Sequence, residues 1–222
     1  MNKNFGPFLL LLGLLVPGLS VSAWPAEAAQ LRAHIADSRG NPVADAIVTL
    51  VPTTATGPLP APAKALMSAT IDQRDETFVP YVVTVAKGGT VTFRNSDKTR
   101  HHVYSFSPIK QFEFVLNPGD SSAPVAFDAT GIAAIGCNIH DFMTAFVYVA
   151  DTPFVAQSDR DGRAVIADVP PGTYSAHVWH PLIRPSAPVA AQTVEIPDGG
   201  AELSTVLPLM APPHRDHEHG LY

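Results

Sequence analysis

The feature that most constrains this chain is the shortness of its apolar segments. Alanine, valine, isoleucine and aromatic residues gather in short runs such as Leu31–Ala36, Val103–Ser107 and Ala145–Val149, and each run is followed closely by aspartate or proline. Long stretches with apolar residues at helical spacing are missing. Because 22 prolines and 15 glycines interrupt the chain, this pattern predicts an all-β architecture with many turns.

The grouping of the runs predicts more than one β unit. The densest group lies in residues 71–150, where about seven short strands in about 80 residues, Phe78–Val85 among them, match the spacing of a sandwich or small barrel. We predict the following organisation: a signal peptide in 1–29, a first flanking β segment in 30–52, a linker in 53–70, the strand-rich domain in 71–150, a second flanking β segment in 151–210 and a disordered tail in 211–222.

The N-terminal segment has the features of a secretory signal peptide. Lys3 precedes an apolar run from Phe5 to Val21, and small residues around Ala26 and Ala29 offer cleavage sites. An uncleaved membrane anchor is the alternative, but the run is short for a membrane span. We therefore predict an exported, periplasmic protein with no membrane span after signal cleavage.

Charge and cysteine content narrow the function classes. A net charge of −6 argues against nucleic acid as a partner. The single cysteine, Cys137, excludes an intramolecular disulfide. A buried, inert cysteine is the ordinary interpretation of a lone thiol, but the residues that follow Cys137 argue for a ligand.

Cys137 opens the segment C-N-I-H-D-F-M, in which a thiol, an imidazole and a thioether follow one another at the spacing C-x-x-H-x-x-M. His140 and Met143 complete the motif, and His101 and His102 lie upstream. A trigonal His₂Cys core with a long, weak axial methionine is typical of copper sites that transfer one electron. The sequence therefore predicts one type 1 copper ion, bound by the three residues of the motif and one upstream histidine.

Other uses of the motif fit the residue types less well. Structural zinc sites draw on more cysteine or histidine and rarely on methionine. Attachment of c-type haem requires a second cysteine in C-x-x-C-H. A nucleophilic Cys-His pair is disfavoured because a histidine three residues away on a tight loop reaches the thiol poorly as a base.

The stretch from Ile71 to Val149 resembles a cupredoxin of the plastocyanin, pseudoazurin and amicyanin kind. The similarity is carried by F-V-P-Y-V-V-T-V-A-K-G-G-T-V-T-F-R-N-S-D, by H-H-V-Y-S-F and by G-C-N-I-H-D-F-M-T-A-F-V-Y-V. The short motif loop is most similar to that of amicyanin, and the flanking β segments resemble those of exported proteins of the methylamine utilisation type. The resemblance implies an eight-stranded Greek-key sandwich that transfers electrons.

Two neighbouring histidines compete for the upstream ligand position. The register of the family makes His101 the ligand, and we adopt it with His102 as the alternative. Strand alternation favours His102, because it shares a face with Tyr104 and Phe106, which we expect in the core. A β-bulge near Ser105 would reconcile the family register with that pattern.

Two further positions carry expectations from the resemblance. Asn95 lies where an asparagine often ties the two ligand loops together by hydrogen bonds, although an ordinary turn residue fits equally well. Asp141 follows His140 where proline is frequent, and Gly136 precedes Cys137 without a nearby tyrosine. Neither departure removes a ligand.

The flanking segments resemble consecutive parts of a carboxypeptidase-regulatory-like β-sandwich. The matching pieces include D-S-R-G-N-P in the first segment and S-D-R-D-G and V-P-P-G-T-Y in the second. We therefore predict that the cupredoxin-like domain is inserted in a loop of this second sandwich. Tandem domains, with a short N-terminal hairpin packed on the copper domain, are the alternative.

These features predict an exported blue copper protein that carries single electrons and is not an enzyme. The expected partner is a redox protein such as a c-type cytochrome or a periplasmic dehydrogenase. We expect the electron to leave through the edge of His140, within an apolar patch. A copper-carrying, copper-storing or partner-binding module without redox turnover is the alternative.

Overall fold

A computed structural model of the chain describes residues 29–54, 57–187 and 189–211. In this part of the chain the regular elements are strands and one short 3-10 helix, Lys64–Leu66, which confirms the predicted all-β class. None of the described helices has the length and hydropathy of a membrane-crossing segment. The predicted signal peptide, up to residue 28, and the predicted tail, from residue 212, lie outside the described residues.

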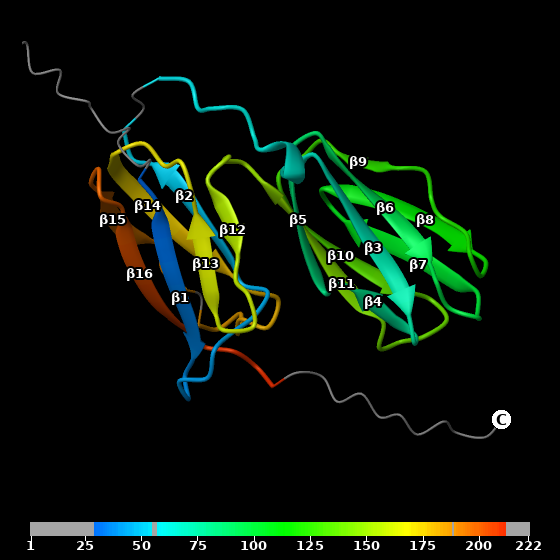
Figure 1. Cartoon of the computed structure of the whole chain (residues 1–222). Coiled ribbons are helices and arrows are strands. Elements are labelled where there is room, and N and C mark those ends of the chain that lie inside the picture. The colour runs from blue at the N-terminus through cyan, green and yellow to red at the C-terminus, as the bar shows by residue number, and fades with distance from the viewer. Residues whose placement is uncertain (1–28, 55–56, 188, 212–222) are drawn as a thin grey trace, which may run out of the picture.

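The strands are labelled in chain order in Figure 1: β1 (Leu31–Asp37), β2 (Ile47–Pro52), β3 (Ser68–Arg74), β4 (Thr77–Val79), β5 (Val82–Ala86), β6 (Gly89–Asn95), β7 (His101–Ser107), β8 (Lys110–Leu116), β9 (Val125–Phe127), β10 (Gly131–Cys137), β11 (Thr144–Ala150), β12 (Val155–Gln157), β13 (Arg163–Ile166), β14 (Gly172–Trp179), β15 (Gln192–Ile196) and β16 (Ala201–Leu207).

One sandwich, the flanking sandwich, is built from residues 29–52 and 151–209. Its two sheets have the strand orders β13-β1-β16 and β12-β2-β14-β15, so each sheet combines strands from both segments. Strand β1 runs parallel to β16 and pairs Leu31 with Ala201. A single hydrophobic core, with members as far apart as Ala29 and Leu207, fills the space between the sheets.

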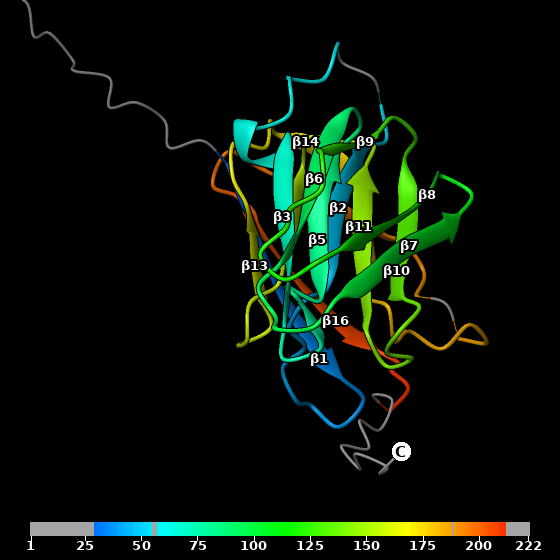
Figure 2. The ribbon, with the colours of Figure 1, turned by 90° about the vertical axis from the view of Figure 1, so that its right-hand side faces the viewer.

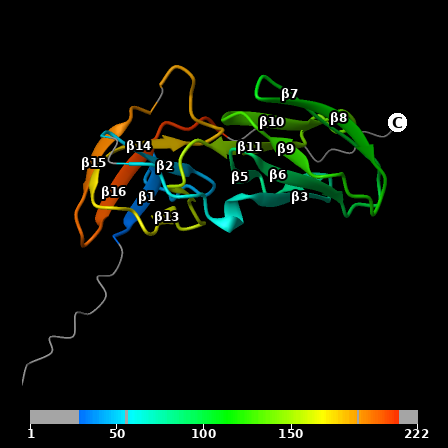
Figure 3. The same ribbon diagram turned by 90° about the horizontal axis from the view of Figure 1, so that it is seen from above.

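The other sandwich, the inserted sandwich, consists of residues 68–150. Its sheets have the strand orders β5-β11-β10-β7-β8 and β4-β3-β6-β9. Seen from above, β7 and β10 lie in one layer and β3 and β6 in the other (Figure 3). Its separate core runs from Ile71 to Val149. Because both segments of the flanking sandwich share the other core, the described chain has the inserted arrangement rather than the tandem one.

Two details differ from the sequence-based expectations. Strand β3 begins at Ser68, inside the stretch 53–70 that we predicted as a linker, because it pairs in parallel with β6. The predicted single strand Phe78–Val85 is interrupted at Pro80, which lacks a backbone N–H. On either side of Pro80, β4 pairs with β3 in one sheet and β5 pairs with β11 in the other.

The fold brings the predicted ligand segments side by side at one end of the inserted sandwich. Strand β10 lies between β11 and β7, and Cys137 pairs with Val103. Gly136 beside it leaves room for the Tyr104 ring, which would lie 2.6 Å from a Cβ at this position. In the view of Figure 2 the inserted sandwich stands in front of the flanking one.

Candidate metal centre

Cys137 ends β10 and starts a compact loop. Its backbone N–H donates a 3.3 Å hydrogen bond to the carbonyl of Met143, and the Met143 N–H donates a 3.0 Å bond to the carbonyl of His140. The next residue, Asn138, donates to the carbonyl of His102 at 3.0 Å. These bonds close the loop on itself and fasten it to the start of β7.

His101 is the first residue of β7 and is completely buried. Val103 and Ser105 share its inward face. The pairing of β7 with β8 runs from His101 to Ser107, and no bulge interrupts this pairing at Ser105. The buried Ser105 hydroxyl is satisfied because it donates to the carbonyl of Lys110 at 2.9 Å.

The expectation that Tyr104 and Phe106 lie in the core is wrong. Both lie on the outer face of β7, where their rings stack at 4.9 Å between centroids, and Phe106 is 68% exposed. His102 shares this outer face, and its Nε2 lies 3.7 Å from the Glu113 carboxylate. Of the two upstream histidines, His101 is the one that lies beside Cys137.

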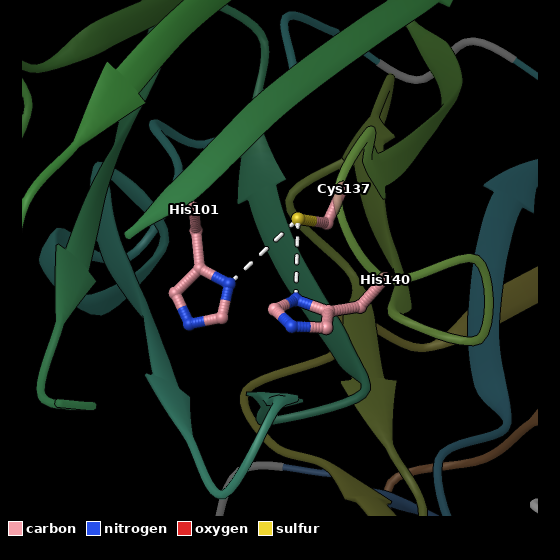
Figure 4. Close-up of side chains that lie close together, drawn as sticks. All are labelled: His101, Cys137 and His140. Atoms are coloured by element: carbon pink, nitrogen blue, oxygen red, sulfur yellow. Dashed lines mark hydrogen bonds between the residues drawn. The ribbon is translucent and has the colours of Figure 1, made fainter. Parts of the chain in front are cut away.

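The structure brings three potential donor atoms together from two strands and a loop. The Sγ of Cys137 lies 3.7 Å from Nδ1 of His101 and 3.9 Å from Nδ1 of His140 (Figure 4). One ligand atom from each residue lies within 4.8 Å of the other two. The imidazole rings of His101 and His140 are 5.1 Å apart between centroids.

These separations suit a metal held by the three residues. Nitrogen and sulfur bound to a first-row divalent metal at about 2.05 and 2.3 Å lie about 3.8 Å apart when the angle at the metal is 120°. The two sulfur–nitrogen distances of 3.7 and 3.9 Å bracket this value. Met143, which is 1% exposed, belongs to the same buried cluster as Cys137.

Carboxylates that the sequence analysis did not single out contact both histidines. The Nε2 of His101 is 2.8 Å from Oδ2 of Asp97, and the Nε2 of His140 is 3.5 Å from Oε1 of Glu76. Both acidic residues lie in loops, where no periodic pattern marks them. The only available signal was the spacing of four residues between Asp97 and His101.

Asn95 has a structural role, but it differs from the one that the resemblance implied. Its Nδ2 donates to the carbonyls of Thr99 and Leu116 at 2.8 and 3.0 Å, and its Oδ1 accepts from the Asp97 N–H at 2.9 Å. Asn95 thus ties the loop before His101 to the end of β8. Its side-chain bonds do not reach the loop that begins at Cys137.

A buried carboxylate anchors the same loop from β3. Burial raises the pKa of Asp72, but hydrogen bonds from Arg74 and Ser96 outweigh this effect and hold the pKa below its usual range. The Arg74 Nε lies 2.7 Å from the Asp72 carboxylate, and the Ser96 hydroxyl donates to it at 2.9 Å. Asp72 therefore stays ionised near neutral pH and holds Ser96 beside Asp97.

The centre reaches the surface on one side only. His101 is fully buried, whereas the His140 side chain is 17% exposed. Next to it, Ile139 and Phe142 are 44% and 41% exposed. The exposed part of His140 therefore borders two exposed apolar side chains and an open groove of about 460 Å³, whose mostly polar lining includes Glu76.

Comparison with known proteins gave similarities to solved structures only, since no family model and no curated protein matches the sequence. A purple cupredoxin from Nitrosopumilus maritimus is 24% identical over 37% of this chain and 99% of its own, with a TM-score of 0.34. Amicyanin from Paracoccus versutus is 22% identical over 46% of this chain and 97% of its own, with a TM-score of 0.35.

A copper-containing nitrite reductase from Thermus scotoductus is 23% identical over 46% of this chain and 25% of its own, with a TM-score of 0.35.

Proposed function

We propose that this protein binds one type 1 copper ion and carries single electrons between redox partners. One observation carries the proposal: the Sγ of Cys137 lies 3.7 Å from Nδ1 of His101 and 3.9 Å from Nδ1 of His140. The fold brings the thiol and the His101 imidazole together although they are 36 residues apart in the sequence. His101, Cys137 and His140 would hold the ion, with Met143 as the axial ligand.

The residue types explain why the site suits electron transfer. Bound copper supplies a one-electron couple, and a thiolate with two imidazoles and a thioether serves both oxidation states. The chain contributes rigidity, because His101 and Cys137 belong to paired strands of one sheet and the motif loop is closed by backbone bonds. Little rearrangement of these donors is then needed when an electron arrives or leaves.

The surface around His140 is the proposed electron exit. Its partly exposed ring lies beside the exposed side chains of Ile139 and Phe142, which offer an apolar contact to a redox protein such as a c-type cytochrome or a periplasmic dehydrogenase. No substrate chemistry is required, so the protein is proposed as a carrier and not as an enzyme. Export to the periplasm remains part of the proposal and depends on residues 1–29.

The finer family assignments belong to the same proposal. We assign the inserted sandwich to the plastocyanin- and amicyanin-like cupredoxins, in an exported protein of the methylamine utilisation type. We assign the flanking sandwich to the carboxypeptidase-regulatory-like kind on its turn motifs, such as the one at Asp159–Gly162. In this proposal the flanking sandwich supports the copper domain, which it contacts through Trp179.

Copper loading of the purified protein tests the proposal. With Cu(II), the wild-type protein should develop an intense visible thiolate-to-copper band and a reversible reduction potential. Cys137→Ser and His101→Ala should each abolish the band. His102→Ala is the matched control and should retain it, because His102 lies on the outer face of β7.

A colourless wild-type protein, or a band that survives Cys137→Ser, would contradict the proposal. Copper that is bound without a reversible potential and is readily surrendered to a chelator would instead favour the copper-carrying alternative. Loss of the band in His102→Ala but not in His101→Ala would show that His102, and not His101, is the upstream ligand.

A further inference from the structure

Each of the two candidate ligand histidines has a carboxylate beside its Nε2, but the two contacts differ in length and burial. Asp97 Oδ2 lies 2.8 Å from His101 Nε2, within hydrogen-bonding distance, and the Asp97 side chain is 11% exposed. Glu76 Oε1 lies 3.5 Å from His140 Nε2, and the Glu76 side chain is 33% exposed. The firm contact is therefore the one between Asp97 and His101.

Asp97 is itself held in place from several directions. Its two carboxylate oxygens accept hydrogen bonds from the backbone N–H groups of Asp75 and Glu76, and its own N–H donates to the buried side chain of Asn95 at 2.9 Å. Asp75 and Glu76 have φ angles of 49° and 53°, which turn their N–H groups towards Asp97. The carboxylate is thus an anchored acceptor.

A fixed hydrogen-bond acceptor beside one ring nitrogen determines which of the two nitrogens of a neutral imidazole carries the proton. A neutral histidine has one N–H, and the hydrogen bond made by one ring nitrogen sets the role of the other. The Asp97 carboxylate already accepts two backbone N–H bonds and acts as an acceptor, so the geometry places the proton of a neutral His101 on Nε2. The unprotonated Nδ1 is then the nitrogen that faces Cys137 Sγ at 3.7 Å.

We propose that Asp97 is a positioning residue, which holds His101 as the Nε2–H tautomer and so presents the Nδ1 lone pair to the metal site before any metal binds. The inference rests on the proposed function in one respect, since it takes Nδ1 to be the atom that binds the metal. The tautomer itself is a property of the metal-free protein. The same carboxylate binds the Glu76 backbone, so Asp97 also places the carboxylate that faces His140.

The proposal has a consequence for metal affinity. Carboxylates that accept from the second nitrogen of a ligand histidine fix its orientation and raise its basicity, and their loss costs about 10–100-fold in metal affinity. The effect should be larger for Cu(II) than for Cu(I), because the carboxylate charge stabilises the more highly charged ion. Loss of Asp97 should therefore also raise the reduction potential.

Nitrogen-15 NMR of the histidine side chains tests the proposal in the full-length, metal-free protein. Wild-type His101 should show its proton on Nε2, in slow exchange with water because the bond is buried. Asp97→Ala removes the acceptor opposite His101 Nε2, while Nδ1 still faces Cys137 Sγ. The His101 proton is then no longer held on Nε2, so the Nε2–H signal should weaken, vanish or exchange rapidly with water.

Asp141→Ala is the matched control. Asp141 is an exposed carboxylate directly after His140, and its substitution removes the same charge near the centre without touching His101. His101 should remain the Nε2–H tautomer in this variant. Titration with Cu(II) should then show the 10–100-fold loss for Asp97→Ala and a much smaller change for the control.

Three results would overturn the proposal: a His101 proton on Nδ1 in the metal-free wild-type protein, rapid exchange of the wild-type Nε2–H with water, or a slowly exchanging Nε2–H that Asp97→Ala leaves unchanged. The wild-type spectrum alone decides the first two points, even if the variant does not fold. Because these signals are recorded without metal, a protein that never turns blue would refute the proposed function and leave this inference standing.

Discussion

At the scale of residues, the candidate centre is asymmetric. His101 is fully buried behind Asp97, while His140 is partly exposed and faces a carboxylate at 3.5 Å. The buried histidine is held in one orientation, and the exposed one borders the apolar surface of Ile139 and Phe142. This division fits a centre in which one imidazole defines the geometry and the other connects it to a partner.

His180, which lies outside the candidate centre, should make the free energy of unfolding depend on pH. Burial lowers the pKa of His180, and the nearby Asp45 and a hydrogen bond to Ala44 offset this only in part. Its Nδ1 accepts the Leu182 N–H at 3.1 Å, a bond that protonation would break. Because the unfolded chain takes up the proton at a higher pH, around 6.5, His180 should stabilise the fold fully above this pH and lose that contribution as the pH falls below it.

Urea unfolding of wild-type protein and of His180→Gln at several pH values between 5 and 8 measures this effect. The difference in unfolding free energy between the two proteins should shrink as the pH falls, since the glutamine does not titrate. Contributions of the other histidines are common to both proteins and cancel. A difference that is constant over the whole range would contradict the assignment of His180 as a buried neutral group.

At the scale of elements, the tight turns of the flanking sandwich restrict the choice of amino acid as strongly as its core does. Gly162, with φ at +71°, lies so close to β1 that a Cβ would collide with the carbonyl oxygen of Ile35 and lie 3.1 Å from the backbone nitrogen of Val43. Its own carbonyl accepts the Ile35 N–H at 2.7 Å. The turn before β13 therefore fits against β1 only if residue 162 has no side chain.

Gly162→Ala should destabilise the protein by about 3 kcal/mol or more, since the cost of a positive φ adds to that of a clash with rigid backbone. Gly40→Ala is the control, because Gly40 has a φ of +83° in the same sandwich but nothing within 4 Å of a Cβ. It should cost about 1 kcal/mol. Equal losses in urea unfolding would show that conformation alone, and not the close approach to β1, requires glycine at 162.

At the scale of the whole molecule, aromatic rings join the two sandwiches. Trp179 at the end of β14 packs against Phe146 and Tyr148 of β11, with ring centroids 5.9 and 5.6 Å apart. Burial raises the pKa of Tyr148, and the nearby Thr49 side chain of β2 offsets this only in part. The strand that follows the motif loop is therefore in direct contact with the flanking sandwich.

Trp179→Ala should uncouple the two sandwiches. We expect the wild-type protein to unfold in one calorimetric transition and the variant in two, with a loss of about 2–3 kcal/mol, since Trp179 is only partly buried. Phe106→Ala is the control, because this exposed ring lies on β7 away from Trp179. A single transition at an unchanged temperature in Trp179→Ala would mean that the rings touch without coupling the sandwiches.

The sequence alone determined the fold class and the chemistry of the candidate ligands. Short apolar runs between turns predicted strands, since no segment after the predicted signal peptide had the length and spacing of a helix. The residue types Cys, His and Met at the fixed spacing C-x-x-H-x-x-M indicated copper. Such signals lie within a few neighbouring residues and need no knowledge of the rest of the chain.

Only the tertiary structure decided how those parts meet. The inward face of β7 depends on the sheet that packs against it, so Ser105 is buried and Phe106 exposed, against their hydrophobicity. Asp97 and Glu76 lie in loops and acquire their roles only when separate strands bring them to the histidines. The pairing of β1 with β16 spans the whole inserted sandwich, and no local pattern encodes a partner at that distance.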